Sequence, residues 1–446
     1  MGKHIDIADY VKNGIIYLPN WINNFLLHCN FLGGNVYFGV EKTRKKLNNL
    51  ENEKQLLKIV NYAIKHVPYY RDKYRGLKIS TVEEFETKIE FIDKEIVNKN
   101  WNDFLSDEVD FSKCKIGNTG GTSGKPIKLV IPKNRYLWEL AHINKIKKRL
   151  GWNYNKIALF RNSDIPDNKD FLINPILKQF IFNIYKLDKD YILKVYNLLK
   201  RNRIRFIDGY PATIYQFFNL CINQNLDLSF LKGCFFTSEG MTTEQKYFFK
   251  KILNIPYVFT YGHSEKLILA GSNLKDYKLK VESTYGYFEL VKNDNELIKK
   301  ENIKGQIIGT TFFNFAMPLI RYKTGDYTSY VEYKSNGSII DDVEGHHNIN
   351  KIYKKNMTYV TLTSLNTHGN INETFSGIQF IQNVPGEIII SIIKKSNYTQ
   401  KSENELFNHY YKAFGQDFNI KFKYVNRLIF QKNGKFLPLI NYVKNR

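Results

Sequence analysis

Residues 234–265 read CFFTSEGMTTEQKYFFKKILNIPYVFTYGHSE and contain two short apolar runs, each followed by a polar turn with a glycine. The runs at 234–237 and 257–260 have the length and composition of buried strands. Between them, Thr242 and Gln245 match a capping box that precedes apolar positions at helical spacing. This stretch therefore predicts two parallel strands joined by a crossover helix.

The same alternation of strands and helices extends upstream. Strands are predicted at 156–160 and 204–207, and helices at 189–201 and 215–223. Apolar residues at helical spacing also predict a helix over 53–66. We therefore expect an α/β fold in which a large N-terminal domain has mainly parallel sheets flanked by helices.

The C-terminal part of the chain has a different pattern. Its predicted elements are strands at 378–382 and 387–393, a helix over 402–415 and a further extended stretch at 419–430. Ser402 and Glu405 match a capping box at the start of that helix. The pattern is typical of a small α+β unit. We place the boundary near Gly345, which gives a large domain over 1–345 and a small domain over 346–446.

Composition restricts the class of protein. The chain has 446 residues, of which 43% are hydrophobic and 15% aromatic, so it has enough apolar surface to fold. Its four cysteines form no CxxC pair, which argues against a zinc site or a disulfide framework. Asp6 and Asp9 are unlike a signal peptide, and Pro19 and several asparagines interrupt the apolar run 15–27. We expect a cytoplasmic protein.

The formal net charge of +23 predicts attraction to anions. Nucleic acid, nucleotides, acidic glycans and the surface of an anionic membrane all fit this charge. The basic residues form short clusters at 42–46, 145–149 and 200–205, a pattern that is also typical of solvated helix faces. The charge alone therefore leaves the partner open.

A glycine-rich segment, Gly117-Asn-Thr-Gly-Gly-Thr-Ser-Gly-Lys-Pro126, has the composition of an anion cradle. Glycines let the backbone approach an anion, hydroxyl side chains add donors, and Lys125 adds a cation. The segment is not a Walker A loop, because Thr119 stands where the first glycine belongs and Pro126 follows the lysine. A flexible surface turn remains the alternative interpretation.

Three further polar turns each follow a predicted strand: Asp208–Pro211, Ser238–Gly240 and Tyr261–Glu265. Ligands of open α/β sheets bind beyond the carboxyl ends of the strands, so these turns predict one pocket wall. Tyr261 could stack on a base, Gly262 lets the base lie close to the backbone, and Glu265 could hold Mg²⁺. Downstream, Asp326 closes the segment 317–326 and could accept hydrogen bonds from both ribose hydroxyls.

Together these segments resemble the ordered core motifs of the adenylate-forming superfamily, which includes acyl-CoA synthetases and peptide-synthetase adenylation domains. Thr119–Pro126 is similar to the phosphate loop, Tyr261–Glu265 to the Tyr-Gly-x-Thr-Glu motif, and Thr324–Asp326 to the Thr-Gly-Asp motif. Val67–Arg71, Gly209–Pro211 and Asn314–Asp326 resemble the phenylacetate–CoA ligase branch, in particular its CapK-type members associated with capsule and surface-polysaccharide synthesis. The similarity runs along nearly the whole chain in the same order.

The resemblance implies a reaction and a set of site residues. A carboxylate attacks the α-phosphate of Mg-ATP and releases pyrophosphate, and a mobile C-terminal domain then rotates for transfer to a thiol or amine. Lys435, within Gly434-Lys435-Phe436, is the expected catalytic lysine, together with Lys125. The implied ATP-binding residues are Thr119, Gly120, Gly121, Thr122, Ser123, Gly124, Ser238, Glu239, Gly240, Tyr261, Gly262, Ser264 and Asp326. The substrate-pocket candidates are Tyr210, Pro211, His263 and Arg321, and the metal ligand is Glu265. A lone histidine such as His263 is more often a packing or hydrogen-bonding residue than a catalyst.

The chain departs from the family at three places. Relatives usually have Gly-Arg followed shortly by Asp at the hinge, whereas Glu344-Gly-His-His-Asn348 has His346 in place of the arginine. Gly120 replaces a loop serine, and Tyr277-Lys278 stands where many relatives have a Tyr-His pair. We expect these changes to affect the contact with the ribose, the rotation of the C-terminal domain and the chemistry of the acceptor.

The function that we expect is ATP-dependent activation of a small carboxylic acid. The acceptor is a thiol, such as CoA, or an amine on a sugar or glycan precursor in capsule or surface-polysaccharide biosynthesis. The charge also suits peripheral association with an anionic membrane. One alternative is a basic nucleic-acid-binding α/β protein, although we find no helix-turn-helix, zinc-finger or RNA-binding signature. The other is a family member that binds nucleotide without catalysis.

Overall fold

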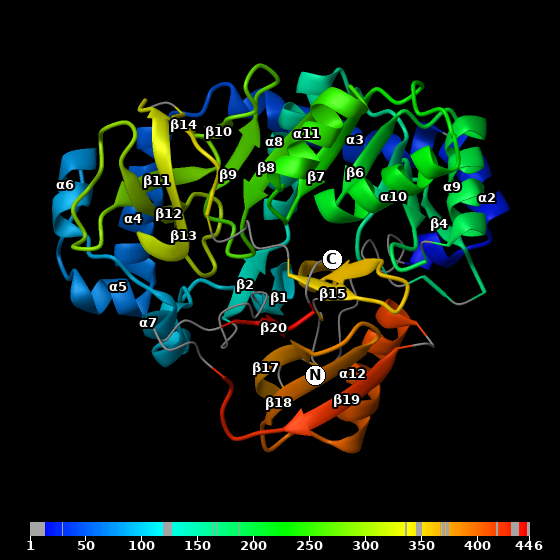
Figure 1. Ribbon diagram of the computed structural model, residues 1–446. Coiled ribbons are helices and arrows are strands. Elements are labelled where there is room, and N and C mark those ends of the chain that lie inside the picture. Colours follow the sequence, from blue (N-terminus) through cyan, green and yellow to red (C-terminus); the bar gives the residue numbers. More distant parts are fainter. Residues whose placement is uncertain are drawn as a thin grey trace.

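The computed structural model describes residues 14–28, 30–118, 127–163, 165–166, 168–186, 188–334, 337–344, 350–365, 367, 371, 374–415, 418–429 and 437–443. Within this part of the chain, a twelve-stranded sheet forms the body of the molecule, in the order β11-β12-β13-β14-β10-β9-β8-β7-β6-β3-β5-β4 (Figure 1). Its strands are β3 (Ile157–Phe160), β4 (Phe171–Asn174), β5 (Gln179–Phe182), β6 (Phe206–Gly209), β7 (Gly233–Thr237), β8 (Tyr257–Gly262), β9 (Leu269–Ser272), β10 (Leu279–Val281), β11 (Gly286–Val291), β12 (Lys304–Thr311), β13 (Tyr322–Glu332) and β14 (Ile339–Ile340).

The parallel strands of this sheet confirm the predicted alternation. β8, β7, β6, β3 and β5 are neighbouring parallel strands. They are connected through α9 (Lys189–Arg201), α10 (Pro211–Asn223) and α11 (Thr243–Tyr247), which continues as a π-helix over Phe248–Ile252. The predicted capping box of Thr242 and Gln245 is present at the start of α11.

Alternate residues of these strands face two different layers of helices. Ile207, Cys234 and Phe236 pack in the core with residues of α9 and α10. Phe206 and Phe235, one position along the strands, pack instead with Ile146 of α8 (Arg135–Lys147). Because successive strand side chains point to opposite faces, the continuous apolar runs of these strands fit a sheet that is covered on both sides.

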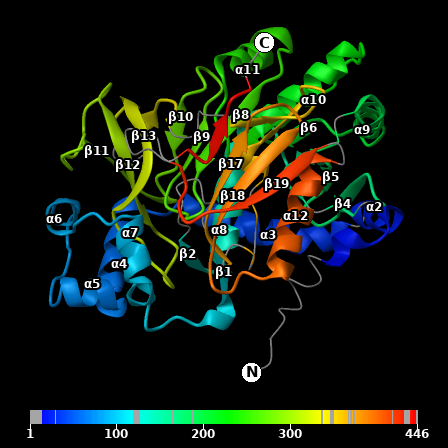
Figure 2. The same ribbon diagram turned by 60° about the horizontal axis from the view of Figure 1, so that its bottom comes forward.

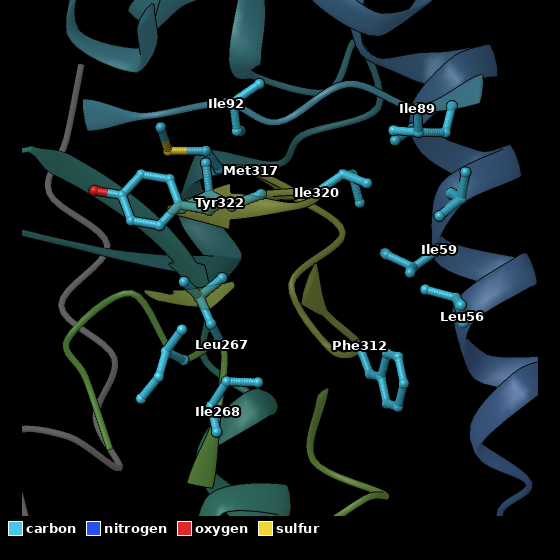
Figure 3. Close-up of a cluster of buried hydrophobic side chains, with 14 of the residues drawn as sticks. Leu56, Ile59, Ile89, Ile92, Leu267, Ile268, Phe312, Met317, Ile320 and Tyr322 are labelled. Atoms are coloured by element: carbon cyan, nitrogen blue, oxygen red, sulfur yellow. The ribbon is translucent and has the colours of Figure 1, made fainter. Parts of the chain in front are cut away.

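The other half of the sheet, β9 to β14, is antiparallel, and its strands were not predicted from the sequence. It packs on the N-terminal helices α4 (Asn52–His66), α5 (Pro68–Lys73), α6 (Val82–Lys88) and α7 (Lys94–Lys99). Leu56 and Ile59 of α4 point from the helix toward Phe312 and Ile320 (Figure 3). The helix predicted over 53–66 is therefore confirmed, with its apolar stripe in the core.

Two segments lie between the large sheet and the small domain (Figure 1). One is the hairpin of β1 (Cys114–Asn118) and β2 (Lys128–Pro132), in which Asn118 pairs with Lys128. The other is the hairpin of β15 (Lys351–Tyr353) and β16 (Tyr359–Thr361). The glycine-rich segment connects β1 with β2, and its residues 119–126 lie outside the described residues.

The small domain is a four-stranded sheet with one helix. Its strands β17 (Phe375–Gln382), β18 (Glu387–Lys394), β19 (Asn419–Tyr424) and β20 (Leu439–Asn441) are ordered β19-β18-β17-β20, and α12 (Gln400–Phe414) packs on them. The predicted α+β class is confirmed. The predicted capping box of Ser402 and Glu405 is wrong: Thr399 is the N-cap, and Ser402 reciprocates its hydrogen bond. Thr399 is extended while Gln400 is already helical, so the helix begins before the predicted start.

The N-terminal part described here contains η1 (Ile15–Tyr17), α2 (Asn20–His28) and α3 (Asn30–Leu47), which approach the β4 end of the sheet and α8. Among the described residues, no helix is both long enough and apolar enough to span a bilayer.

Candidate active site

The polar turns after β6, β7 and β8 lie at one edge of the sheet, as predicted. Gly209 pairs with Phe236, and Thr237 pairs with Thr260, so the three parallel strands end side by side. The turns at Tyr210, Ser238 and His263 begin directly beyond these ends. This edge faces the small domain (Figure 1).

The turn after β6 is set by a close approach between two backbones. A Cβ atom on Gly209 would lie 2.2 Å from the carbonyl oxygen of Phe160, so only glycine fits there. The same carbonyl accepts a hydrogen bond from the N–H of Tyr210 at 3.2 Å. Pro211 then begins α10, where its missing N–H costs no helical hydrogen bond. Tyr210 and Pro211 are both buried.

The turn after β7 contains a strained residue. Ser238 has φ of +68°, a left-handed conformation that non-glycine residues adopt rarely, and its side chain is exposed. Backbone strain of this kind is concentrated at functional sites. Glu239 and Gly240, which follow it, are buried.

Tyr261 connects the two halves of the sheet. Its hydroxyl lies 2.8 Å from Oδ2 of Asp326 and 2.6 Å from Nε2 of His263. Burial, and then the Asp326 carboxylate, raise the pKa of Tyr261 well above its ordinary value, so the hydroxyl keeps its proton and donates to Asp326. The structure therefore brings together three of the predicted site residues.

The Tyr261 ring itself is only 2% exposed and packs in the hydrophobic core. Stacking on a base, as the sequence suggested, would require neighbouring side chains to move. Gly262 and Ser264, by contrast, are exposed beside it.

Glu265 is half-buried in the same turn. Burial raises the pKa of its carboxyl, an effect that nearby Lys94 opposes and Asp326 reinforces. A nearby cation stabilises the ionised form of a carboxylate that burial would otherwise keep protonated. The predicted donor, a hard carboxylate oxygen, fits Mg²⁺, which typically binds one or two carboxylates together with phosphate oxygens and water. No group of three or more His, Cys, Asp or Glu side chains suited to a metal occurs in the described part of the chain.

Glu239 connects the β7 turn to the segment that leads into the small domain. Its carboxylate accepts a hydrogen bond from the hydroxyl group of Thr361. The hydroxyl of Thr363 and the N–H of Ala212, at the start of α10, also favour its ionised form. Nearby, the side chain of Gln216 exchanges two hydrogen bonds with the backbone of Tyr359, at 3.0 and 3.1 Å. The β15–β16 hairpin is thus docked on α10.

Burial raises the pKa of Glu239 from 4.5 to about 7, although its hydrogen bonds oppose the shift. The folded protein therefore holds an extra proton between these values, and its free energy of unfolding decreases by up to roughly 3 kcal/mol as the pH rises through this range. We expect Glu239→Gln to remove this decrease. Urea denaturation midpoints between pH 5 and 8 measure it, with Glu244→Gln as the exposed control. An unchanged slope in Glu239→Gln would show that another group is responsible.

Arg321 does not lie with the other pocket candidates. It is buried, and its guanidinium donates to both carboxylate oxygens of Glu289, at 2.8 and 3.3 Å. It also donates to the carbonyls of Glu86 and Ile89 at the end of α6, at 2.7 and 2.6 Å. Phe91 covers the guanidinium at 4.0 Å. These contacts use the guanidinium inside the core. The predicted substrate contact of Arg321 is therefore replaced by a structural role in holding β11 and the end of α6.

Several predicted residues lie outside the described part of the chain. They are the phosphate-loop residues Thr119, Gly120, Gly121, Thr122, Ser123, Gly124 and Lys125, the hinge residue His346 and the catalytic candidate Lys435. Their roles stay predictions. The described neighbours of Lys435 are held by one buried side chain, Gln379, whose amide donates to the carbonyls of Ile429 and Leu437 at 2.8 Å each.

Sequence reasoning missed a buried ion cluster below this edge. Asp208, the third residue of β6, accepts from Lys147 at 2.5 Å and from Arg161 at 2.5 and 3.0 Å. A solvated helix face, which was one interpretation of the basic cluster 145–149, does not apply to Lys147, because Lys147 is buried. Arg149 likewise binds Glu282 at 2.5 Å. The sequence predicted a strand that ends at residue 207 and a polar turn that begins at Asp208, whereas β6 extends through Gly209 and buries Asp208 among these cations.

Comparison with known proteins agrees with this architecture. Residues 352–442 match the CapK C-terminal domain family. The chain is 23% identical over 410 residues to protein CapK of Staphylococcus aureus, covering 86% of this chain and 87% of that protein. A crystal structure of 2-hydroxyisobutyryl-CoA ligase with 2-HIB-AMP and CoA in the thioesterification state aligns with a TM-score of 0.55 at 12% identity, over 87% of this chain and 88% of that one. The postadenylation state of the same ligase aligns with a TM-score of 0.52 at 12% identity, over the same shares of the two chains.

The predicted resemblance is confirmed: the C-terminal segment matches the CapK C-terminal domain family, the chain is similar to CapK along most of its length, and its fold is similar to that of 2-hydroxyisobutyryl-CoA ligase.

Proposed function

We propose that this protein activates a carboxylic acid with ATP as an acyl-adenylate and transfers the acyl group to a thiol or amine. The observation that carries the proposal is the contact of Tyr261 with Asp326, which joins two motifs at the edge where β6, β7 and β8 end. The ligase of similar fold has been crystallised with an acyl-AMP and CoA.

In the proposed reaction, a carboxylate oxygen of the acid attacks the α-phosphorus, and the bond from that phosphorus to the bridging oxygen of pyrophosphate breaks. Positioning and cationic stabilisation dominate such displacements. Asp326, fixed by Tyr261, would accept hydrogen bonds from the ribose. The phosphate loop 119–126, with Lys125, would hold the triphosphate, and Lys435 would neutralise the developing charge.

Glu265 would hold Mg²⁺ through its carboxylate, and the ion would supply positive charge beside the phosphates. We expect Glu265→Gln to raise the Mg²⁺ concentration needed for half-maximal rate by about tenfold or more, since an amide oxygen lacks the carboxylate charge. Titration of Mg²⁺ in a pyrophosphate-release assay measures this. Asp294→Asn, on a surface turn after β11, is the matched control. An unchanged Mg²⁺ dependence of Glu265→Gln would place the metal elsewhere.

We further propose that the acid or its acceptor belongs to capsule or surface-polysaccharide assembly, with an amino sugar or glycan precursor as acceptor; CoA is the other candidate acceptor. Similarity to CapK supports the first, and the fold shared with a CoA ligase supports the second.

The test of the proposal is acid-dependent pyrophosphate release. A panel of aromatic, aliphatic and uronic acids is supplied with Mg-ATP, first alone and then with CoA or amino sugars. One acid should stimulate release of pyrophosphate, and the acyl-adenylate should appear in mass spectrometry. Binding of ATP without release for any acid would favour a family member that binds nucleotide without catalysis.

A further inference from the structure

We propose that Tyr17, Leu18, Trp21 and Phe25, together called the aromatic patch, dock this protein on the surface of an anionic membrane. The proposal concerns a face of the molecule at the β4 end of the large sheet, where α2 lies beside β4 and away from β11 (Figure 2). It is independent of the reaction proposed above.

The side chains of the aromatic patch are unusually exposed to solvent for large apolar residues. Trp21 is 75% exposed and Phe25 is 68% exposed, the largest fractions among the bulky apolar side chains that the structure describes. Trp21 and Phe25 are spaced by four residues, so they share one face of α2, and Tyr17 and Leu18 precede the helix. Asn23 and Leu27 on the other face are buried. The helix therefore presents an apolar stripe outward as well as packing inward.

Hydrogen bonds to the rest of the protein fix the backbone that carries the aromatic patch. The Asn23 amide donates to the carbonyl of Ile15 at 2.8 Å, and the Asn20 amide donates to the carbonyl of Phe171 at 3.0 Å, on the edge strand β4. The Lys169 ammonium donates to the carbonyls of Tyr17 and Leu18 at 2.9 and 3.1 Å. These bonds fix the turn at Pro19, so the aromatic side chains are exposed by a defined backbone.

The charges around the patch favour a lipid surface over a protein partner. Residues 14–40 contain no Asp, Glu, Lys or Arg, so this stretch itself adds no charged side chain to the patch. Lys42, Lys45 and Lys46 are exposed at the C-terminal end of α3, which packs on α8, and they add to the positive charge of the chain. Lys169 adds a further cation at the patch itself, and the chain carries +23 overall.

This combination matches how peripheral proteins bind bilayers. Trp, Tyr and Phe side chains insert at the level of the headgroups, while nearby Lys and Arg attract anionic lipids. α2 has nine residues, which suits shallow insertion in the plane of the interface. The occupant that we assign is therefore a bilayer containing anionic phospholipid.

The test is vesicle flotation of the full chain with phosphatidylglycerol-containing vesicles and with pure phosphatidylcholine vesicles. We expect binding to the anionic vesicles that weakens with salt. The double variant Trp21→Asn/Phe25→Asn should lower the partition coefficient by about tenfold or more, because two aromatic side chains no longer leave water. Tyr247→Asn, which removes an exposed aromatic on α11, should bind as the unmodified protein does.

Tryptophan fluorescence gives a second measurement. Of the four tryptophans, Trp152 is buried and Trp101 and Trp138 are half-buried, so brominated lipid should quench the emission of Trp21 and leave the double variant unaffected. Equal flotation of the double variant, or unquenched Trp21, would overturn the proposal. Concentration-dependent dimerisation that depends on the patch, without vesicle binding, would assign the surface to a second copy of this chain instead.

Discussion

Lys435→Ala is expected to reduce acid-dependent pyrophosphate release by about 10²–10³-fold, the usual cost of removing one group that stabilises transition-state charge. ATP binding should persist, because the phosphate loop and Asp326 are untouched. Paired assays of pyrophosphate release and of ATP binding by calorimetry measure the two properties. Lys421→Ala, an exposed lysine on β19, is the control and should retain the full rate.

The surroundings of Lys435 provide an independent measurement. Gln379 is buried and bonds to backbone groups of Ile429 and Leu437, which flank the segment containing the lysine. Gln379→Met removes these bonds at similar volume and should lower the rate less than Lys435→Ala does. A normal rate for Lys435→Ala would remove this lysine from the mechanism, whatever Gln379→Met shows.

The largest effect on stability is expected for Arg321→Leu. The substitution leaves the Glu289 carboxylate buried without its partner, and breaking a buried pair in this way typically costs about 3–5 kcal/mol. It also removes the donors that bind the carbonyls of Glu86 and Ile89. We expect a clear decrease in the urea denaturation midpoint, followed by tryptophan fluorescence.

The matched control is the double variant Arg321→Leu/Glu289→Leu. Because it removes both charges, it should recover much of the loss, as replacement of buried ion pairs by apolar residues often does. A wild-type midpoint for Arg321→Leu, together with a raised KM for the acid, would restore the substrate contact that the sequence suggested.

Local elements of this fold could be predicted from the sequence, whereas the buried pair of Arg321 and Glu289 could not. The strands at 234–237 and 257–260 and the capping box of Thr242 depend on local pattern, and the structure contains all three. Arg321 and Glu289 are far apart in the sequence and meet only when β11 and β13 form the sheet. No local pattern distinguishes such a buried arginine from one that binds a ligand.

The candidate site was predictable to the extent that it depends on strand order. Parallel strands end at one edge, so the neighbourhood of Tyr210, Ser238 and His263 followed from the alternation. The hydrogen bond of Glu239 with Thr361 did not, because it joins the large sheet to the β15–β16 segment. Such a contact depends on how two separately packed parts of the chain meet. The spacing of apolar residues predicts helices and strands but not contacts of this kind.

The order of the small sheet has a consequence for synthesis of the protein. β20, at Leu439–Asn441, lies beside β17 and covers that edge of the sheet. The chain is synthesised from the N-terminus, so every strand of the large sheet emerges from the ribosome before β17. β17 has no partner along this edge until β20 has been synthesised. A nascent or prematurely terminated chain therefore exposes the unpaired backbone of Phe380 and Ile381, an edge that promotes aggregation and recognition by chaperones or proteases.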